Sequence, residues 1–420
     1  MDQQEPTLAE RPQSAIRASL SLLRRNPDFR RLYLASVISY GGDWFLTVAL
    51  FGLVLELSES PILASMIVVA QMLPFFFTSP FGGVLADRMD RQRLMVASDL
   101  ARAVVIAGML LVRGPELVWL AIALQAFESA FAGFFEPAAT AAIPNLVDEE
   151  DLSTANALAG SAWGTMLAVG AALGGVVSAT LGRDAAFIGD SFSFVVSALL
   201  LMRIRRKFNE ALPEEHPGIL SATVETIRYA RKDKRVLSLI AVKGGFGLGG
   251  GFIVLLPLIA TRVFDAGDIG IGLVMAARGM GALIGPFIGR ALAGESDRRL
   301  FRTIGFALGS FGIFYAFFPL MPSLLLALPF ATFAHLGGGA QWSLSTYGLQ
   351  KMVPDYIRGR VFAFDVALIT LTLALSNVGA GIAASLWGPK VAMGIGVGIS
   401  MIYAAAWWIA TRRVRRALTD

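Results

Sequence analysis

Long apolar runs separated by short polar stretches dominate the chain between residues 32 and 411. A helix rises about 1.5 Å per residue, so about 20 apolar residues cross the roughly 30 Å hydrocarbon core of a bilayer. The runs have this length, and the pattern therefore predicts an all-α membrane protein with twelve spans. The predicted spans are residues 32–55, 62–86, 94–112, 117–142, 155–181, 185–203, 236–262, 268–292, 301–320, 323–349, 360–386 and 390–411.

A polar stretch near the middle of the chain divides the predicted spans into two sets of six. The predicted units are a cytoplasmic N-terminal segment at 1–31, a six-helix bundle at 32–203, a cytoplasmic linker at 204–235, a second six-helix bundle at 236–411 and a cytoplasmic tail at 412–420. In the first segment, Ile16, Leu20 and Leu23 recur at helical spacing among arginines. This spacing fits either a helix on the membrane surface or a basic tail without fixed structure.

The two sets of spans carry traces of an internal repeat. Leu85 and Asp90, after the second span, recur as Leu292 and Asp297 after the eighth span, 207 residues later. Two six-helix halves related in this way are typical of secondary transporters, whose substrate site lies near the bilayer midplane between the halves. We therefore expect two pseudo-symmetric bundles.

Composition and charge agree with a membrane location. Hydrophobic residues make up 55% of the chain and charged residues 16%, whereas soluble domains contain about 25% charged residues. The net charge is +5, and most basic residues outside the spans lie in loops on one side of the predicted membrane. The positive-inside rule makes this side the cytoplasm, and it explains the basic loops without a nucleic-acid partner, so none is expected. We predict a multi-pass protein of the bacterial inner membrane with both termini in the cytoplasm.

The residue inventory excludes several kinds of chemistry. The chain has no cysteine and only two histidines, His216 and His335, so disulfides, thiolate catalysis and a cysteine- or histidine-based metal centre are not expected. No glycine-rich loop ending in Gly-Lys-Ser or Gly-Lys-Thr is present, so the chain does not hydrolyse ATP itself. We expect no metal, no cofactor and no enzymatic activity. An ion gradient, a partner protein or the substrate's own gradient would drive transport.

The loop after the second span reads GVLADRMDR, beginning at Gly83. Gly83 permits close approach of helices, Asp87 can cap a helix N-terminus, and Arg88 and Arg91 can pair with carboxylates at facing helix ends. The loop resembles the signature of the major facilitator superfamily, with Asp90 in place of a usual glycine. The resemblance implies a latch between the two halves on the cytoplasmic side. The alternative is a basic loop that only sets the topology.

Further groups of residues are similar to one exporter branch of that superfamily, which contains enterobactin and macrolide efflux proteins. They are Asn26, Phe29 and Arg30, Gly42-Asp43-Trp44, Glu136-Pro137-Ala138, Ile143-Pro144-Asn145-Leu146-Val147 and Arg358-Gly359-Arg360-Val361. The resemblance implies that Arg358 and Arg360, at the entry to the eleventh helix, belong to the latch. It also implies export of a drug, macrolide or siderophore, with multidrug resistance as one outcome.

Ionisable residues inside the predicted spans are the candidates for proton coupling or substrate binding. Such residues are costly in hydrocarbon and face the bundle interior or water. The candidates are Asp43, Glu128 and Glu136 in the first half, and Lys243, Arg278, His335 and Asp365 in the second. Acidic groups therefore gather in one half and basic groups in the other. The alternative for each residue is a structural ion pair or packing role, which we favour for Asp190 near the outer end of its span.

Two predicted spans are rich in glycine. The fifth span carries Gly164, Gly170, Gly174 and Gly175, which allow close packing against a partner helix, although Ala171 stands where proton-driven exporters often have proline. The seventh span has six glycines between residues 244 and 251, and the run predicts a bend or close packing. Interrupted helices often border transporter binding sites.

These features together predict a monomeric secondary transporter that exports an amphipathic small molecule by proton antiport and alternating access. Its partners are the substrate, protons and the bilayer. In this scheme an external proton binds Asp43 or Glu128 and favours release of substrate outside. One alternative is a lipid or lysolipid flippase of the same fold; another is an intramembrane transferase, which would turn over its substrate in detergent.

Overall fold

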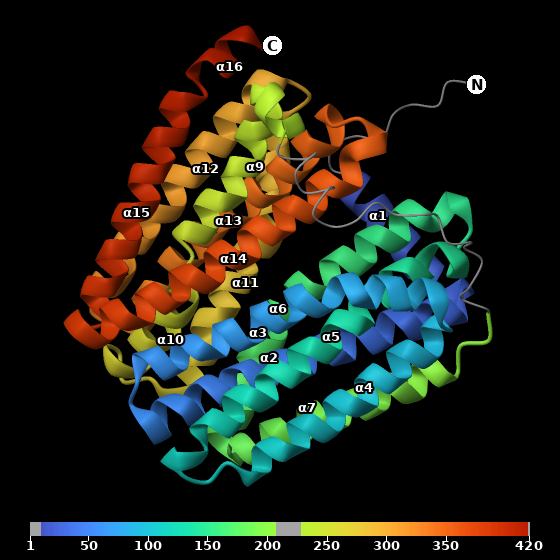
Figure 1. Cartoon of the computed structure of the whole chain (residues 1–420), viewed down its shortest axis with the longest axis vertical. Helices are drawn as coiled ribbons and strands as arrows, with labels where there is room; N and C mark the ends of the chain where they lie inside the picture. The colour runs from blue at the N-terminus through green and yellow to red at the C-terminus, as the bar shows by residue number, and fades with distance from the viewer. Residues whose placement is uncertain (1–9, 207–227, 419–420) are drawn as a thin grey trace.

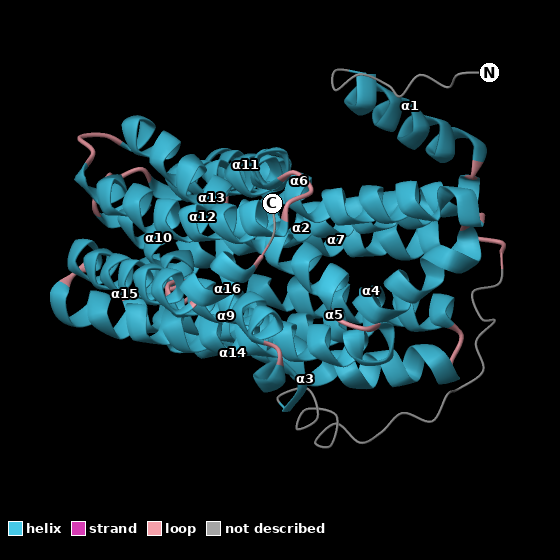
Figure 2. Cartoon of the chain, turned by 90° about the horizontal axis from the view of Figure 1, so that it is seen from above, coloured by secondary structure: helices cyan, strands magenta, loops and turns pink. Residues whose placement is uncertain are grey.

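The computed structural model describes residues 10–206 and 228–418, with side chains described from residue 17 onward. Within these ranges the secondary structure is helical and contains no strand (Figure 2). Twelve helical spans are long and apolar enough to cross a membrane. The helices are α1 (Glu10–Arg25), α2 (Pro27–Ser58), α3 (Pro61–Arg88), α4 (Arg91–Ala107), α5 (Val118–Leu146), α6 (Leu152–Leu181), α7 (Arg183–Met202), α9 (Lys234–Leu248), α10 (Phe252–Arg262), α11 (Gly267–Ala293), α12 (Asp297–Phe317), α13 (Leu324–Met352), α14 (Asp355–Trp387), α15 (Pro389–Ala410) and α16 (Arg412–Ala417).

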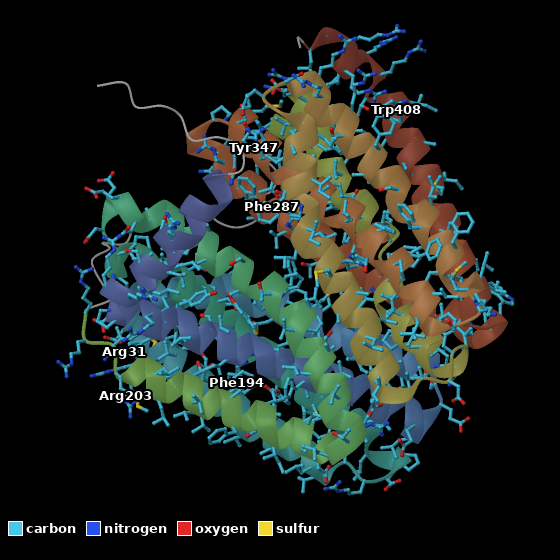
Figure 3. All side chains as sticks on the ribbon, turned by 180° about the vertical axis from the view of Figure 1, so that it is seen from behind. Arg31, Phe194, Arg203, Phe287, Tyr347 and Trp408 are labelled. Atoms are coloured by element: carbon cyan, nitrogen blue, oxygen red, sulfur yellow. The ribbon has the colours of Figure 1, made fainter. Side chains whose placement is uncertain are left out.

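Helices α2–α7 form one bundle and helices α9–α15 form the other (Figure 1). The predicted all-α architecture of two six-span bundles is confirmed. The bundles converge at one face of the molecule and diverge toward the face that carries α1 and α16. We call the latter the terminal face and the former the opposite face. Arg31 and Arg203 lie at the terminal-face end of the first bundle (Figure 3).

Local sequence signals set where the helices begin. Asn26, Ser60, Asp90 and Ser296 each accept a hydrogen bond from a backbone N–H in the first turn of the following helix, which satisfies a donor that has no intrahelical partner. Asp90 therefore has a clear role at the position where the family signature has glycine, because it caps α4. Asp90 and Ser296 are the N-caps of corresponding helices of the two halves and lie 206 residues apart, one residue less than the offset of the sequence repeat.

The turns at Gly182 and Gly388 show the repeat in the backbone itself. Gly182 joins α6 to α7 with φ 86° and ψ 160°, and Gly388 joins α14 to α15 with φ 83° and ψ 161°. This region of backbone space is open almost only to glycine. The two glycines are also 206 residues apart, so the same strained turn recurs at the same place in each half.

The glycine-rich seventh span is interrupted, which confirms the predicted bend. Helix α9 ends at Leu248 and α10 begins at Phe252. Helix α14 supplies hydrogen bonds to the backbone at the break: Asn377 Oδ1 accepts from the Val254 N–H at 3.0 Å, and Ser376 Oγ accepts from the Gly251 N–H at 2.8 Å. Side-chain partners of this kind let a membrane helix break inside the protein, where water does not reach the freed backbone groups.

The two bundles meet closely along α6 and α11 and along α3 and α14. Glycines allow this approach: a Cβ on Gly175 of α6 would lie 2.9 Å from the Cα of Gly272, and one on Gly381 of α14 would lie 2.7 Å from the Cβ of Ser65. The fifth-span glycines thus pack closely against neighbouring helices, as predicted. All four of these residues lie in the half of the membrane nearer the opposite face.

The N-terminal segment and the linker are described in part. Residues 10–25 form helix α1, which packs through the fully buried Leu22 against the first bundle. Helix α2 begins at Pro27, earlier than the predicted residue 32, because Asn26 and Pro27 start it before the apolar run begins. Most of the linker, including His216, lies outside the described residues.

Candidate functional site

A cavity of about 640 Å³ lies between the bundles, and the helices of the first bundle form most of its wall. It extends from the middle of the membrane, at Asp43 and Thr47, to Ile143 and Asn156, which lie near the terminal-face ends of α5 and α6. Among the described residues that line it, Ile253, Met275 and Arg278 come from the second bundle. The remaining lining residues are Tyr40, Trp44, Leu46, Gln71, Met72, Phe75, Arg102, Gln125, Glu128, Ser129, Ala132, Glu136, Thr140, Ala159, Gly160 and Trp163.

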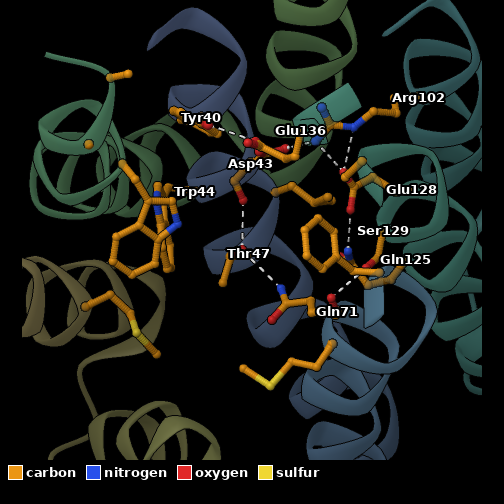
Figure 4. Close-up of a pocket in the computed structure, with 18 of the residues that line it drawn as sticks. Tyr40, Asp43, Trp44, Thr47, Gln71, Arg102, Gln125, Glu128, Ser129 and Glu136 are labelled. Carbon is orange, nitrogen blue, oxygen red and sulfur yellow. Dashed lines mark hydrogen bonds and ion pairs between the residues drawn. The ribbon is translucent and has the colours of Figure 1, made fainter. Parts of the chain in front are cut away.

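Arg102 of α4 is the centre of a charge network in this wall (Figure 4). Its Nη2 donates to Asp43 Oδ1 at 2.7 Å and to Glu128 Oε1 at 2.5 Å, and its Nε donates to the same Glu128 oxygen at 2.8 Å. The guanidinium also stacks 4.0 Å from the ring centroid of Phe194. The side chains of Arg102 and Glu128 are almost fully buried, whereas 30% of the Asp43 side chain is exposed, so Asp43 is the member of the network most open to the cavity.

Two further carboxylates lie behind the network. Asp99, one helical turn before Arg102, accepts from Ser197 Oγ at 2.5 Å and has its Oδ1 3.7 Å from Arg102 Nη1. Asp190 of α7 is fully buried and has one oxygen without a hydrogen-bond partner. Gly42 of α2 leaves room for it, because a Cβ there would overlap with the Asp190 carboxylate. Asp190 therefore lies next to the residue that precedes Asp43.

Glu136 forms a separate acidic point nearer the terminal face. Its Oε1 accepts from the Tyr40 hydroxyl at 2.8 Å. Glu136 and Glu128 are eight residues apart on α5, and both line the cavity. Gln125, one turn from Glu128 on the side away from Glu136, donates to Glu128 Oε2 at 2.7 Å.

The second bundle arranges its charges differently. Lys243 of α9 forms a buried ion pair with Asp365 of α14, donates to Thr346 Oγ1 at 3.1 Å and lies over the ring of Trp342. His335 is buried against the edges or faces of two aromatic rings, with centroids 5.4 Å from Phe311 and 5.7 Å from Tyr315. Neither the pair nor the histidine lines the cavity.

Arg278 is the charged residue of the second bundle that does line the cavity. Its contact within the described chain is weak, from Nη1 to Met275 Sδ at 3.8 Å, and its buried Nε has no acceptor. Arg278 lies 206 residues after Met72, so matching positions of the two halves line the cavity, one with an apolar and one with a cationic side chain.

At the opposite face, an ion-pair cluster joins the two bundles. Arg183, the first residue of α7, binds both carboxylate oxygens of Asp268 in α11, at 2.8 and 3.1 Å, and also binds Glu56 of α2 at 2.5 Å. Arg262 of the second bundle donates to the backbone carbonyl of Glu59 in the first. We call Arg183, Asp268, Glu56, Arg262 and Glu59 the opposite-face cluster. Together with the close glycine contacts, this cluster holds the two bundles together at this face.

The structure brings together some of the residues singled out from the sequence. Asp43, Glu128, Glu136 and Arg278 share the cavity, while Lys243 and Asp365 pair elsewhere and His335 lies in an aromatic cluster. The partner of Asp43 is Arg102, rather than a basic residue of the other half. Sequence reasoning missed Arg102 and Asp99, although an Asp and an Arg three residues apart inside an apolar span are a readable signal.

The residues assigned to a cytoplasmic latch lie at the terminal face. Arg91 donates to the carbonyls of Ala86 and Ala141 within its own bundle, and Arg358 donates to the carbonyl of Val353. Gly83 and Arg88 lie in the last turns of α3, and Arg360 lies in the first turns of α14. The side chain of Asp87 lies outside the described part of the structure. Among the described residues, no group of His, Asp and Glu has a metal-binding arrangement.

Solved structures share this fold. A bacterial homologue of the lysosomal transporter Spinster, in an inward-facing and unoccupied conformation, superposes with a TM-score of 0.71 at 13% identity over 93% of this chain and 98% of that one. A bacterial homologue of the iron transporter ferroportin, in an inward-facing state, also has a TM-score of 0.71, at 16% identity over 92% of this chain and 98% of that one. At these identities the likeness establishes the fold alone.

Related sequences are named as exporters. BacE of Bacillus subtilis, which carries the provisional name bacilysin exporter, is 25% identical over 84% of this chain and 87% of its own length. Macrolide efflux protein A of Streptococcus pyogenes is 23% identical over 83% and 87%, and the enterobactin exporter EntS of Shigella boydii is 29% identical over 82% of each. The family model described as transmembrane secretion effector matches residues 18–417. The chain therefore belongs to the transmembrane secretion effector family of major facilitator transporters.

Proposed function

We propose that this protein exports an amphipathic small molecule from the cytoplasm in exchange for protons. The observation that carries the proposal is the excess of carboxylates in the wall of the cavity and directly behind it. Asp43, Asp99 and Glu128 contact a single arginine, and Glu136 and Asp190 add two more carboxylates without a basic partner. One guanidinium cannot neutralise five carboxylates inside a membrane, so the remaining charge requires protons or a cationic ligand.

The coupling step that we propose uses Asp43 and Arg102. With Asp43 ionised and bound to Arg102, the cavity accepts substrate from the terminal face. A proton that reaches Asp43 from the other side neutralises the carboxylate and breaks its ion pair with Arg102. This change weakens substrate binding and favours release of the substrate outside. The proton then leaves when the cavity again faces the cytoplasm. The exporter names of the relatives support this direction of transport.

Alternating access in this scheme needs two closures, one at each face. The described conformation has the cavity extending toward the terminal face and the bundles joined by the opposite-face cluster. We propose that the terminal face is cytoplasmic and that the loop from Gly83 to Arg91, with Arg358 and Arg360, closes it in the other state. An impermeant thiol reagent applied to intact cells should then label Ser58→Cys and leave Lys232→Cys unlabelled.

Transport in proteoliposomes with an imposed pH gradient tests the coupling. A panel of a macrolide, a catecholate siderophore, lipophilic cations and zwitterionic dipeptides is screened with the wild-type chain, and a transported compound is then used with Asp43→Asn. This variant should lose pH-driven accumulation while still moving the compound down its own gradient. Asp184→Asn is the matched control, since Asp184 pairs with Arg113 on the surface of the opposite face.

Two outcomes would count against the proposal. Gradient-driven export by Asp43→Asn at the wild-type rate would remove Asp43 as the proton carrier and transfer that role to Glu128 or Glu136. Failure of the wild-type chain to export any compound of a broad panel under a pH gradient would reject proton-driven export. A fluorescent lysolipid included in the panel tests the flippase alternative directly.

A further inference from the structure

The cavity has walls of opposite charge. The first bundle supplies Asp43, Glu128 and Glu136, and the second bundle supplies Arg278. Each carboxylate of this wall has a partner in its own bundle, Arg102 or Tyr40. Arg278 has no carboxylate within ion-pair distance anywhere in the described chain, and its Nε is buried without an acceptor. On its side of the cavity, Arg278 therefore lacks an anionic partner among the described residues.

An unpaired guanidinium inside a membrane protein is costly to maintain. Elsewhere in the same bundle the cost is removed, because Lys243 is matched by Asp365. Packing alone does not require an arginine at position 278. At the matching position of the first half, the apolar side chain of Met72 lines the same cavity. A site that holds five N–H donors in a rigid plane suits a carboxylate, which accepts two of them side by side.

The surface between the charged walls is apolar and aromatic. Trp44 and Trp163 lie edge to face with centroids 6.0 Å apart, and Phe75 and Met275 also line the cavity. The volume of about 640 Å³ falls in the range of small-molecule sites, roughly 300–1,000 Å³. A ligand that fits this arrangement has an anionic end, an apolar body and a cationic end.

We propose that the transported molecule is a zwitterion with a free carboxylate and an ammonium group, of the amino-acid or short-peptide class. Its carboxylate binds Arg278 and its ammonium faces the acidic wall at Asp43 and Glu136. The inference rests on the proposed export function and specifies its substrate class. Because one half of the transporter holds each charge, a bound zwitterion also bridges the two bundles.

Matched compounds test the charge requirement. Each set comprises a dipeptide with a free amine and a free carboxylate, the same dipeptide as its C-terminal amide, and its N-acetyl derivative. Sets built on alanyl-phenylalanine, alanyl-tyrosine, alanyl-leucine and phenylalanyl-alanine vary the apolar body. Binding to the purified full chain is followed by tryptophan fluorescence, since Trp44 and Trp163 line the cavity. In at least one set the zwitterion should bind at least about tenfold more tightly than both derivatives, equivalent to about 1.4 kcal/mol.

Variants locate the effect at Arg278. Arg278→Gln should bind the zwitterion and its amide equally, whereas Arg278→Lys should retain part of the preference. Arg290→Gln is the control: Arg290 lies on the same helix, pairs with Glu295 near the terminal face and does not line the cavity, so the preference should remain. Melting temperature and size-exclusion profile identify a variant that fails to fold, and Arg278→Met then replaces Arg278→Gln.

The inference is overturned if no set shows preference for the zwitterion, or if Arg278→Gln keeps the wild-type preference. These outcomes are distinguishable from failure of the export proposal. If the chain exports a cationic compound under a pH gradient but binds the zwitterion and its C-terminal amide equally, only the proposed substrate class is overturned. A chain that binds zwitterions through Arg278 but shows no proton-driven transport overturns the coupling and leaves the binding site.

Discussion

The two bundles share a repeat of backbone turns and caps but differ in how they treat charge. In the first bundle, the described interior holds five carboxylates around or beside Arg102, in the wall of the cavity or directly behind it. In the second, Lys243 and Asp365 form a closed one-to-one pair away from the cavity, and Arg278 lacks a carboxylate partner. The two halves therefore share their backbone arrangement and differ in their charged side chains. An excess of acid suits proton exchange, and a balanced pair suits helix attachment.

The largest effect should follow loss of Arg102. Arg102→Met leaves Asp43 and Glu128 buried without their shared partner, and removal of one member of a buried ion pair typically costs about 3–5 kcal/mol. We expect a strong fall in membrane level and melting temperature, and no transport. Adding Glu128→Gln removes one of the uncompensated charges and should recover part of the stability. If Arg102→Met alone is as stable as the wild type, the network is not organised around this residue.

The second prediction concerns the Lys243–Asp365 ion pair of the second bundle, in contrast to the Arg102 network. Lys243→Met alone isolates the Asp365 carboxylate and should be destabilising, whereas the double variant Lys243→Met/Asp365→Asn should regain most of the melting temperature because no buried charge is left unpaired. The double variant should also keep pH-driven export. This separates a structural pair from the coupling residues. Loss of pH dependence in a well-folded double variant would assign coupling to both halves and break the contrast.

The fold was largely predictable from the sequence because its signals are local. The length of the apolar runs predicts the spans, and caps such as Asn26 and Ser60 fix helix starts within a few residues. The glycine run before Pro257 predicts the break between α9 and α10. These features depend on neighbouring residues along the chain, and the central polar stretch with the internal repeat added the two-bundle arrangement.

The site was less predictable because its contacts join distant helices. Asp43, Arg102 and Glu128 are separated by 59 and 26 residues, and their pairing depends on how α2, α4 and α5 pack. The charge segregation between halves was visible, but the sequence did not distinguish Lys243, which is paired, from Arg278, which is not. The sequence also did not predict that Asp190 is fully buried beside Gly42.

The smallest expected effect concerns the opposite-face cluster, where ion pairs join the two bundles. Asp268→Asn removes a bidentate partner of Arg183 across the bundles, at a site that water partly reaches. A loss on the order of 1 kcal/mol shifts a two-state equilibrium about fivefold. The population with an open opposite face should therefore rise, with little change in melting temperature. Since the chain has no cysteine, spin labels at Glu116→Cys and Ser323→Cys, exposed turn residues of the two bundles on this face, report the distance between them.

The control for this experiment is Arg113→Gln. The Arg113–Asp184 ion pair lies on the same face but within the first bundle, so Arg113→Gln breaks an ion pair of this face without affecting the junction between the bundles. The label distance should lengthen in a larger fraction of Asp268→Asn molecules and stay as in the wild type for Arg113→Gln. Identical distance distributions in both variants would mean that the glycine contacts of α6 with α11 and of α14 with α3 hold the opposite face without help from the ion pairs. In that case the two bundles meet through shape alone, and their difference in charge is confined to the cavity.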